Sequence, residues 1–194
     1  SARAMVESGL ADHGWSYINI DDGWQGKRGG KDNAIQPNAK FPDMKGLTRA
    51  IHDMGLRVGI YSTRWIGTYA AHIGSYSDNP DGVNEWIKKG RHNEHYRYQK
   101  EGGNYWKDRT EVWHLGPYSF VEADVKQWGE WGIDYLKYDW NPLDYYHVKE
   151  MHDALRTLDR DVVYSLSNSA PYGDAPQWMQ YSNCWRTTGD IRDT

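Results

Sequence analysis

Segments whose apolar residues have helical spacing alternate along the chain with short, mainly apolar runs. Apolar residues at positions 47, 50, 51 and 54 follow the i, i+3, i+4, i+7 spacing of one helix face. Short apolar runs of strand length separate this segment from other helical segments. The runs cover residues 15–20, 56–61, 133–138, 162–166 and about 183–186. The pattern predicts strands that alternate with helices, of which the first covers 2–13 and the last, a short one, covers about 175–181.

Residues suited to helix ends stand at the boundaries of these segments. Asp43 and Asp144 are each placed to accept a hydrogen bond from a first-turn N–H group. Ser119-Phe-Val-Glu122 has the sequence of a capping box. Glycines at positions 14, 55 and 132 follow predicted helices, where a left-handed residue commonly ends the helix.

The repeated β–α order predicts an α/β fold with a parallel sheet. A doubly wound sheet would commonly carry a glycine-rich phosphate loop, and no G-x-G-x-x-G or Walker A sequence occurs here. A (β/α)₈ TIM barrel places polar residues after successive strands, and this chain does so. These residues are Asp21, Asp22, Tyr61, Lys137, Asp139, Asn168, Arg186 and Asp190. We therefore expect a partial barrel with about five of the eight β/α units that the fold requires.

The segment 62–118 interrupts the repeat. It is polar, rich in Gly, Trp and Tyr, and has no sustained period, so we expect an ordered, aromatic-rich insertion. Its His92 and His95 form a metal-like pair without a third ligand, which favours surface histidines over a metal site. The sequence thus implies no metal.

Composition narrows the classes of function. The 194 residues carry a net charge of −4, which argues against a nucleic-acid surface. The sequence has no apolar run of ~18 residues, so no membrane-spanning segment is predicted. The 11 Trp and 15 Tyr against 2 Phe suit either a groove that stacks sugar rings or an ordinary core. A single Cys excludes an intrachain disulfide.

The end of the third predicted strand carries the clearest candidate chemistry. Strand side chains alternate faces, so Tyr135, Lys137 and Asp139 share one face, and Leu136 and Tyr138 share the other. Lys137 and Asp139 could form a structural ion pair. Alternatively, the ammonium lowers the pKa of Asp139 and keeps an ionised carboxylate available as a nucleophile.

Other carboxylates follow other predicted strands. Asp190 could supply the second of the two carboxylates that glycoside hydrolysis requires. Asp21 and Asp22 suit adjacent sugar hydroxyls, but an Asp pair at a strand end could equally bind a divalent metal or start a turn.

Four segments together resemble glycoside hydrolase family 27, the melibiase family. They are Tyr-Ile-Asn-Ile-Asp21-Asp22-Gly-Trp24-Gln, Gly59-Ile-Tyr61-Ser, Trp131-Gly-Ile-Asp-Tyr-Leu-Lys137-Tyr-Asp139 and Trp185-Arg186-Thr-Thr-Gly-Asp190-Ile. They occur in the family's order and extend over nearly the whole chain. The resemblance implies a retaining glycosidase on a barrel that a β-sandwich usually follows, with no cofactor.

The resemblance also implies residue roles, carried over motif by motif. Asp139 is the expected nucleophile and Asp190 the expected general acid/base. The expected substrate-binding residues are Asp21 and Asp22 for the O4 and O6 hydroxyls, Trp24, Tyr61, Lys137, Asn168 and Arg186. The implied reaction is release of terminal α-linked galactose, so the expected partner is a carbohydrate.

Departures from the family pattern leave alternatives open. Gly23 replaces a frequent Cys, and Cys184 does not match the family's disulfide positions, which together suggest a disulfide-free, bacterial-type branch. The localisation stays open, with a secreted or periplasmic bacterial protein as one expectation. The turn Asn168-Ser169-Ala170 differs in sequence from the family's usual turn, which faces the 2-position of the sugar. An α-N-acetylgalactosaminidase, a β-L-arabinopyranosidase, an isomalto-oligosaccharide-releasing enzyme and a non-catalytic carbohydrate-binding protein therefore remain alternatives. The resemblance also suggests that the sequence is a piece of a longer protein, without the β-sandwich.

Overall fold

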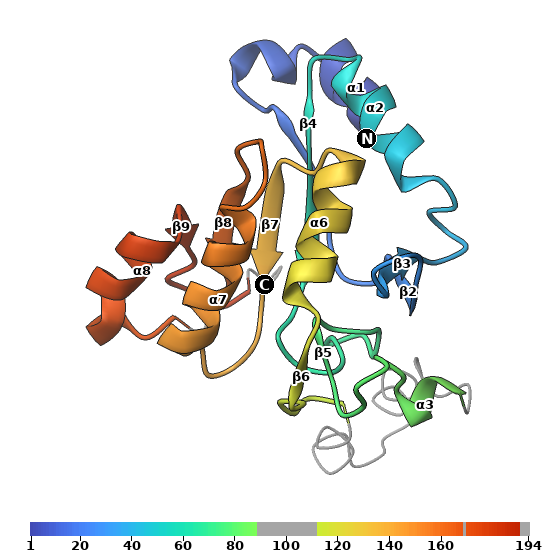
Figure 1. Cartoon of the computed structure of the whole chain (residues 1–194). Helices are drawn as coiled ribbons and strands as arrows, with labels where there is room; N and C mark the ends of the chain where they lie inside the picture. The colour runs from blue at the N-terminus through green and yellow to red at the C-terminus, as the bar shows by residue number, and fades with distance from the viewer. Residues whose placement is uncertain (89–111, 169, 191–194) are drawn as a thin grey trace, which may run out of the picture.

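The central element of the computed structural model is a five-stranded parallel sheet (Figure 1). The structure describes residues 1–88, 112–168 and 170–190. The strands are β1 (Tyr17–Ile20), β4 (Arg57–Ser62), β7 (Tyr135–Tyr138), β8 (Val163–Leu166) and β9 (Cys184–Trp185). Their spatial order, β1-β4-β7-β8-β9, follows the chain without reversal. A doubly wound sheet would reverse its order at a switch point, so this order confirms the wall of a (β/α) barrel.

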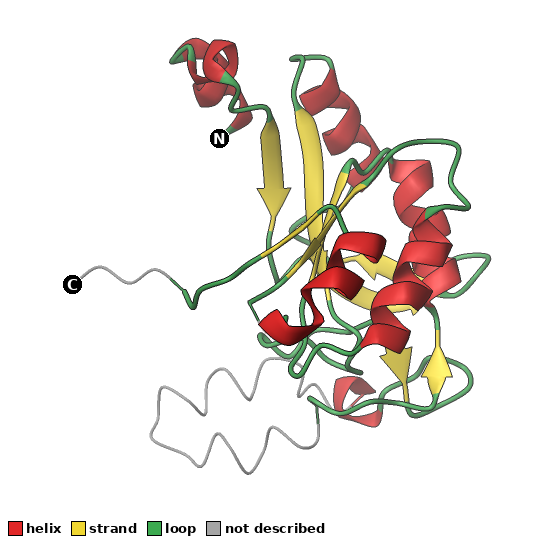
Figure 2. Ribbon diagram, turned by 90° about the vertical axis from the view of Figure 1, so that its left-hand side faces the viewer, coloured by secondary structure: helices red, strands yellow, loops and turns green. Residues whose placement is uncertain are grey.

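Helices cover one face of this sheet (Figure 2). The covering helices are α2 (Met44–His52), α6 (Val121–Trp131), α7 (Tyr145–Leu155) and α8 (Ala175–Tyr181), whereas α1 (Ala2–Glu7) lies beyond the start of β1. Helix α6 contacts both α2 and α7, and α7 also contacts α8. Val125, Trp128, Val148 and Met151 are buried on the inner faces of α6 and α7. The predicted strand alternation is confirmed, because Leu136 is fully buried while Lys137 is only half-buried.

The helix ends agree with the sequence where a local side chain caps them. The Asp43 carboxylate accepts from the Gly46 N–H at 2.8 Å, and Asp144 accepts from the His147 N–H at 3.0 Å. The Ser119 capping box is wrong. Phe120 occupies the N-cap of α6, and its side chain has no polar atom to cap the helix. The Ser119 hydroxyl, one residue earlier, donates to Glu150 at 2.7 Å and accepts from the Val121 N–H at 3.4 Å.

The predicted helix 2–13 is two shorter elements. Gly9, with φ of 77°, separates α1 from a 3₁₀ helix over Leu10–His13. The left-handed conformation at Gly9 cannot continue a right-handed helix. A second 3₁₀ helix covers Tyr172–Asp174, directly before α8. Gly132, with φ of 86°, ends α6 as expected.

Two antiparallel pairs were not predicted. Strands β2 (Gln25–Gly29) and β3 (Ala34–Pro37) form a hairpin after β1. Arg28 on this hairpin makes a buried ion pair of 2.7 Å with Asp124 on α6. Their burial as a pair explains how a polar strand can pack against a helix, since each charge is compensated.

The described part of the insertion 62–118 is ordered. It contains the strand pair β5 (Tyr76–Ser77) and β6 (Tyr118–Ser119) and the short helix α3 (Glu85–Lys88). His92, His95 and Trp106 lie outside the described residues. Within the described ranges, no three His, Cys, Asp or Glu side chains could hold a metal ion, and no helix is both long and apolar enough to cross a membrane.

Candidate active site

One cavity of about 310 Å³ opens at the carboxyl edge of the sheet. Its lining residues are Asp21, Asp22, Tyr61, Tyr69, Lys137, Asp139, Ser167, Asn168, Arg186 and Asp190. The parallel register brings them together, since Tyr61 on β4 pairs with Lys137 on β7, which pairs with Ser165 on β8. Every predicted site residue except Trp24 lies in this lining.

Asp139, directly after β7, is the most buried carboxylate of the cavity, with 7% of its surface exposed. Its Oδ2 accepts a hydrogen bond of 3.2 Å from the Tyr61 hydroxyl, and its buried Oδ1 has no hydrogen-bond partner. Burial raises the pKa of Asp139, whereas neighbouring Ser167 and Lys137 act to lower it. Burial also raises the pKa of Tyr61 well above its usual value, so the phenol remains a donor.

Lys137 does not pair directly with Asp139. Its Nζ donates to the two carboxylate oxygens of Asp21, at 3.0 and 3.3 Å. The expectation that this ammonium lowers the pKa of Asp139 overall is therefore wrong. Because Lys137 is bound to another carboxylate, its effect on Asp139 is smaller than the opposing effect of burial.

Asp22 also keeps an oxygen free. Its Oδ2 accepts from the Ala70 N–H at 2.8 Å, while its buried Oδ1 has no hydrogen-bond partner. Burial is the main cause that raises the pKa of Asp22 from 3.8 to about 6. Asp21 lies beside it and adds like-charge repulsion. Two buried carboxylate oxygens at this cavity, one on Asp22 and one on Asp139, thus have no hydrogen-bond partner in the protein.

The far side of the cavity is charged and more open. Arg186 donates to Asp190 Oδ1 at 2.9 Å, and the Asp190 side chain is 79% exposed. Asn168 is exposed after β8 and accepts a hydrogen bond of 3.3 Å from the Ser167 hydroxyl. Ser169, in the same turn, lies outside the described residues. Asp139 and Asp190 therefore share one cavity but differ strongly in exposure.

Trp24 does not line the cavity, in contrast to the prediction. It is fully buried, its ring packs edge to face on Trp131 at 5.7 Å, and its indole N–H donates to the Tyr61 carbonyl at 2.8 Å. This side chain has no surface to offer a sugar. It fixes the backbone of Tyr61, and so acts on the cavity from behind.

Two lining residues were missed by the sequence analysis. Ser167 follows a predicted strand and could have been found from its position after β8. Tyr69 comes from the aperiodic insertion, and no local signal separates it from the neighbouring aromatics.

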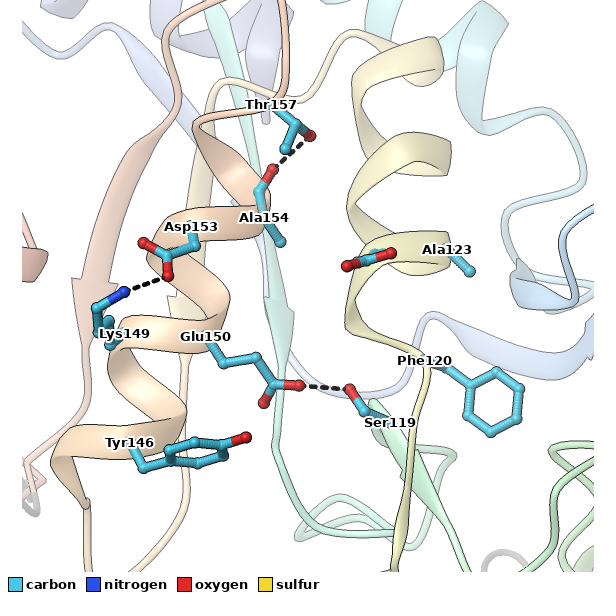
Figure 3. Close-up of a pocket in the computed structure, with 10 residues that line it drawn as sticks. Ser119, Phe120, Ala123, Tyr146, Lys149, Glu150, Asp153, Ala154 and Thr157 are labelled. Atoms are coloured by element: carbon cyan, nitrogen blue, oxygen red, sulfur yellow. Dashed lines mark hydrogen bonds and ion pairs between the residues drawn. The ribbon is translucent and has the colours of Figure 1, made fainter.

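A larger groove of about 710 Å³ lies between α6 and α7 (Figure 3). Its central carboxylate, Glu150, already accepts hydrogen bonds from Ser119 and Tyr76, and Lys149 pairs with Asp153. Because these charges are compensated and no strand of the five-stranded sheet ends in the groove, the smaller cavity at the sheet edge is the better candidate for catalysis.

A (β/α) barrel wall with one polar cavity at its carboxyl edge is typical of barrel enzymes. The acidic side chains around this cavity are of the kind that glycosidases use. The family model described as "Alpha galactosidase A" matches residues 1–89. The probable alpha-galactosidase of Dictyostelium discoideum is 30% identical over 100% of this chain and 40% of its own length. Alpha-galactosidase A of Cellvibrio japonicus is 33% identical over 98% of this chain and 38% of its own length.

The solved structures agree with these relatives. Alpha-galactosidase I from Mortierella vinacea superposes with a TM-score of 0.68 and 28% identity, over 98% of this chain and 40% of that one. This chain belongs to the melibiase family, glycoside hydrolase family 27. It spans about two fifths of the length of these curated relatives.

Proposed function

We propose that the protein is a retaining α-galactosidase that releases terminal α-linked galactose by double displacement. The observation that carries this proposal is the Asp139 carboxylate, which is buried and hydrogen-bonded on one oxygen and unpartnered on the other. Asp190, a second carboxylate, lines the same cavity. Retaining glycosidases need one carboxylate as a nucleophile and one as acid and base.

In the first step, the Asp139 carboxylate attacks the anomeric carbon and the glycosidic bond breaks. The Tyr61 hydroxyl donates to Oδ2 of Asp139 and so orients this carboxylate. The leaving oxygen takes a proton from Asp190. In the second step Asp190 removes a proton from water, the water attacks the anomeric carbon, and Asp139 is released as a carboxylate.

The remaining polar groups suit the ring hydroxyls. The unpartnered Asp22 Oδ1 can accept a hydrogen bond from one hydroxyl, and the Asp21–Lys137 pair offers an acceptor and a donor for another. The relatives named as alpha-galactosidases support galactose as this sugar. Trp24 makes no contact with the sugar in this proposal and acts only on the Tyr61 backbone behind the cavity.

The exposed turn at Asn168 favours an α-N-acetylgalactosaminidase as a second candidate. Ser167 and Asn168 are small and neutral, and they line the cavity beside Arg186. Such a wall leaves room for a 2-acetamido group. Galactose comes first because the guanidinium of Arg186 suits a free 2-hydroxyl.

Turnover of aryl glycosides by the complete protein tests the proposal. We expect kcat/KM for the aryl α-galactoside to exceed that for the aryl α-N-acetylgalactosaminide. Proton NMR should show α-galactose as the first sugar released, because two inversions give retention. A ratio below one would replace the substrate but keep the mechanism. First release of β-galactose would contradict the mechanism. Sugar binding without turnover would contradict the proposed activity and would favour a non-catalytic carbohydrate-binding protein.

A further inference from the structure

Tyr69 is the one aromatic wall residue that the insertion contributes to the described lining of the cavity. Its ring packs against two tryptophans, at centroid distances of 5.2 Å from Trp65 and 4.8 Å from Trp113. The two indoles are stacked on each other at 5.7 Å. Trp113 lies 44 positions beyond Tyr69 in the sequence, so the two arms of the insertion meet at this ring.

The backbone on both sides of Tyr69 is also held. The Ala70 N–H donates to Asp22 at 2.8 Å, and the Thr68 carbonyl accepts from the Trp113 indole N–H at 2.7 Å. A hydrogen bond of 2.7 Å from the Thr68 N–H to the His72 carbonyl closes the turn. Tyr69 is therefore fixed beside Asp22, with little freedom to move away from a ligand.

A fixed aromatic ring beside a hydroxyl-binding carboxylate suits one part of galactose in particular. The exocyclic hydroxymethyl arm has a hydroxyl for a carboxylate such as Asp22 and a CH₂ group for an aromatic surface such as Tyr69. Sugar recognition commonly joins these two contacts, since aromatic rings offer a flat apolar face.

We infer that Tyr69 is a specificity-determining residue that packs against this hydroxymethyl arm, and that Trp113 is the positioning residue that holds Tyr69 there. The inference rests on the proposed function and deepens it, because it assigns recognition of a hexopyranose over the matching pentopyranose. The 62–118 insertion then has a defined part in choosing the substrate.

The test compares aryl α-D-galactopyranoside with aryl β-L-arabinopyranoside, which has the same ring configuration but no hydroxymethyl arm. Tyr69→Ala in the complete protein should lower the ratio of their kcat/KM values by roughly 10-fold, the size of one lost apolar contact in a specificity pocket. Tyr69→Phe should keep the ratio of the unmodified protein, because the phenylalanine ring makes the same apolar contact. Tyr146→Ala removes an exposed tyrosine on α7 and is the matched control, with an unchanged ratio.

Trp113→Phe tests the positioning role. It keeps an aromatic ring but removes the N–H that binds the Thr68 carbonyl. We expect the galactoside KM to rise several-fold, with kcat and the melting temperature nearly unchanged. An unchanged substrate ratio in Tyr69→Ala would overturn the inference alone. Failure of the unmodified complete protein to hydrolyse either glycoside would overturn the proposed function and the inference with it.

Discussion

Two aspartates at opposite ends of strand β7 meet very different surroundings. Asp134 precedes the strand, and both of its oxygens have partners. Arg160 donates to Oδ1 at 2.5 Å, the Val58 N–H donates to Oδ2 at 2.8 Å, and His52 lies 2.7 Å from Oδ2. Asp139 follows the strand, and one of its buried oxygens has no hydrogen-bond partner.

In the function that we propose, this difference separates a structural carboxylate, Asp134, from a reactive one, Asp139. A buried polar atom without a partner costs free energy, so folding alone would favour a cluster like that of Asp134. Asp139 retains this cost and keeps one oxygen without a partner in the protein. The contrast agrees with the division in (β/α) barrels between a stabilising edge and a catalytic edge.

The largest effect is expected from Asp139→Asn. The amide cannot act as the nucleophile, so kcat for an aryl α-galactoside should fall roughly 10⁴-fold or more, while galactose still binds. Steady-state kinetics and calorimetric titration with galactose measure the two effects. Retained turnover in this variant would assign the nucleophile to another residue.

A smaller loss is expected from Asp190→Ala. Without the proton donor, kcat/KM should fall roughly 10²–10⁴-fold for substrates with poor leaving groups, and much less for an activated nitrophenyl leaving group. Azide should partly restore activity and give a glycosyl azide of retained configuration. Equal losses for good and poor leaving groups would remove Asp190 from the acid role.

At the other end of β7, we expect a substitution to lower stability and to leave activity nearly unchanged. Asp134→Ala should lower the free energy of unfolding by about 2–4 kcal/mol, because Arg160 and the Val58 N–H lose their acceptor. The kcat of the folded enzyme should change little. Urea unfolding gives the first value and initial rates give the second. A large fall in kcat with unchanged stability would reverse the assignment of the two aspartates.

The smallest effect concerns pH and Asp22. Its pKa is raised to about 6, so its carboxylate is protonated below that pH and kcat/KM should fall up to about 10-fold per pH unit. In Asp22→Asn this acid limb should be lost or displaced, because the amide does not ionise. An acid limb that is identical in both proteins would exclude Asp22 as its source.

The same raised pKa has a consequence for folding. The unfolded carboxyl ionises near 3.8 and the folded one near 6, so the native state loses stability as pH rises through this window. Asp22→Asn should therefore raise the free energy of unfolding above pH 6, by up to about 3 kcal/mol. Unfolding curves at pH 4 and pH 7 measure the difference, which should be near zero at pH 4.

Local patterns predicted much of this fold. The five strands followed from short apolar runs, and the Asp43 and Asp144 caps followed from side chains that bond three residues away. The predicted Ser119 capping box failed because the helix starts one residue later, with Phe120 at its N-cap, while Ser119 also binds Glu150, 31 positions distant. The β2–β3 hairpin was missed because its buried charge, on Arg28, depends on Asp124 in a distant helix.

The site shows the same limit. The position of a polar residue after a strand was enough to place Asp21, Asp139 and Asp190 at one cavity. It was not enough to say which carboxylate Lys137 binds, since both candidates lie at the same edge. Tyr69 enters the cavity through an aromatic packing that only the folded insertion creates.

Covalent labelling tests the central assignment most directly. A fluorinated α-galactosyl donor that forms the glycosyl–enzyme quickly and hydrolyses slowly should leave one sugar on the complete protein. We expect peptide mass spectrometry to place the sugar on Asp139, with the adduct absent in Asp139→Asn and present in Asp134→Ala. An adduct on Asp190, or hydrolysis of the donor without any adduct, would contradict Asp139 as the nucleophile.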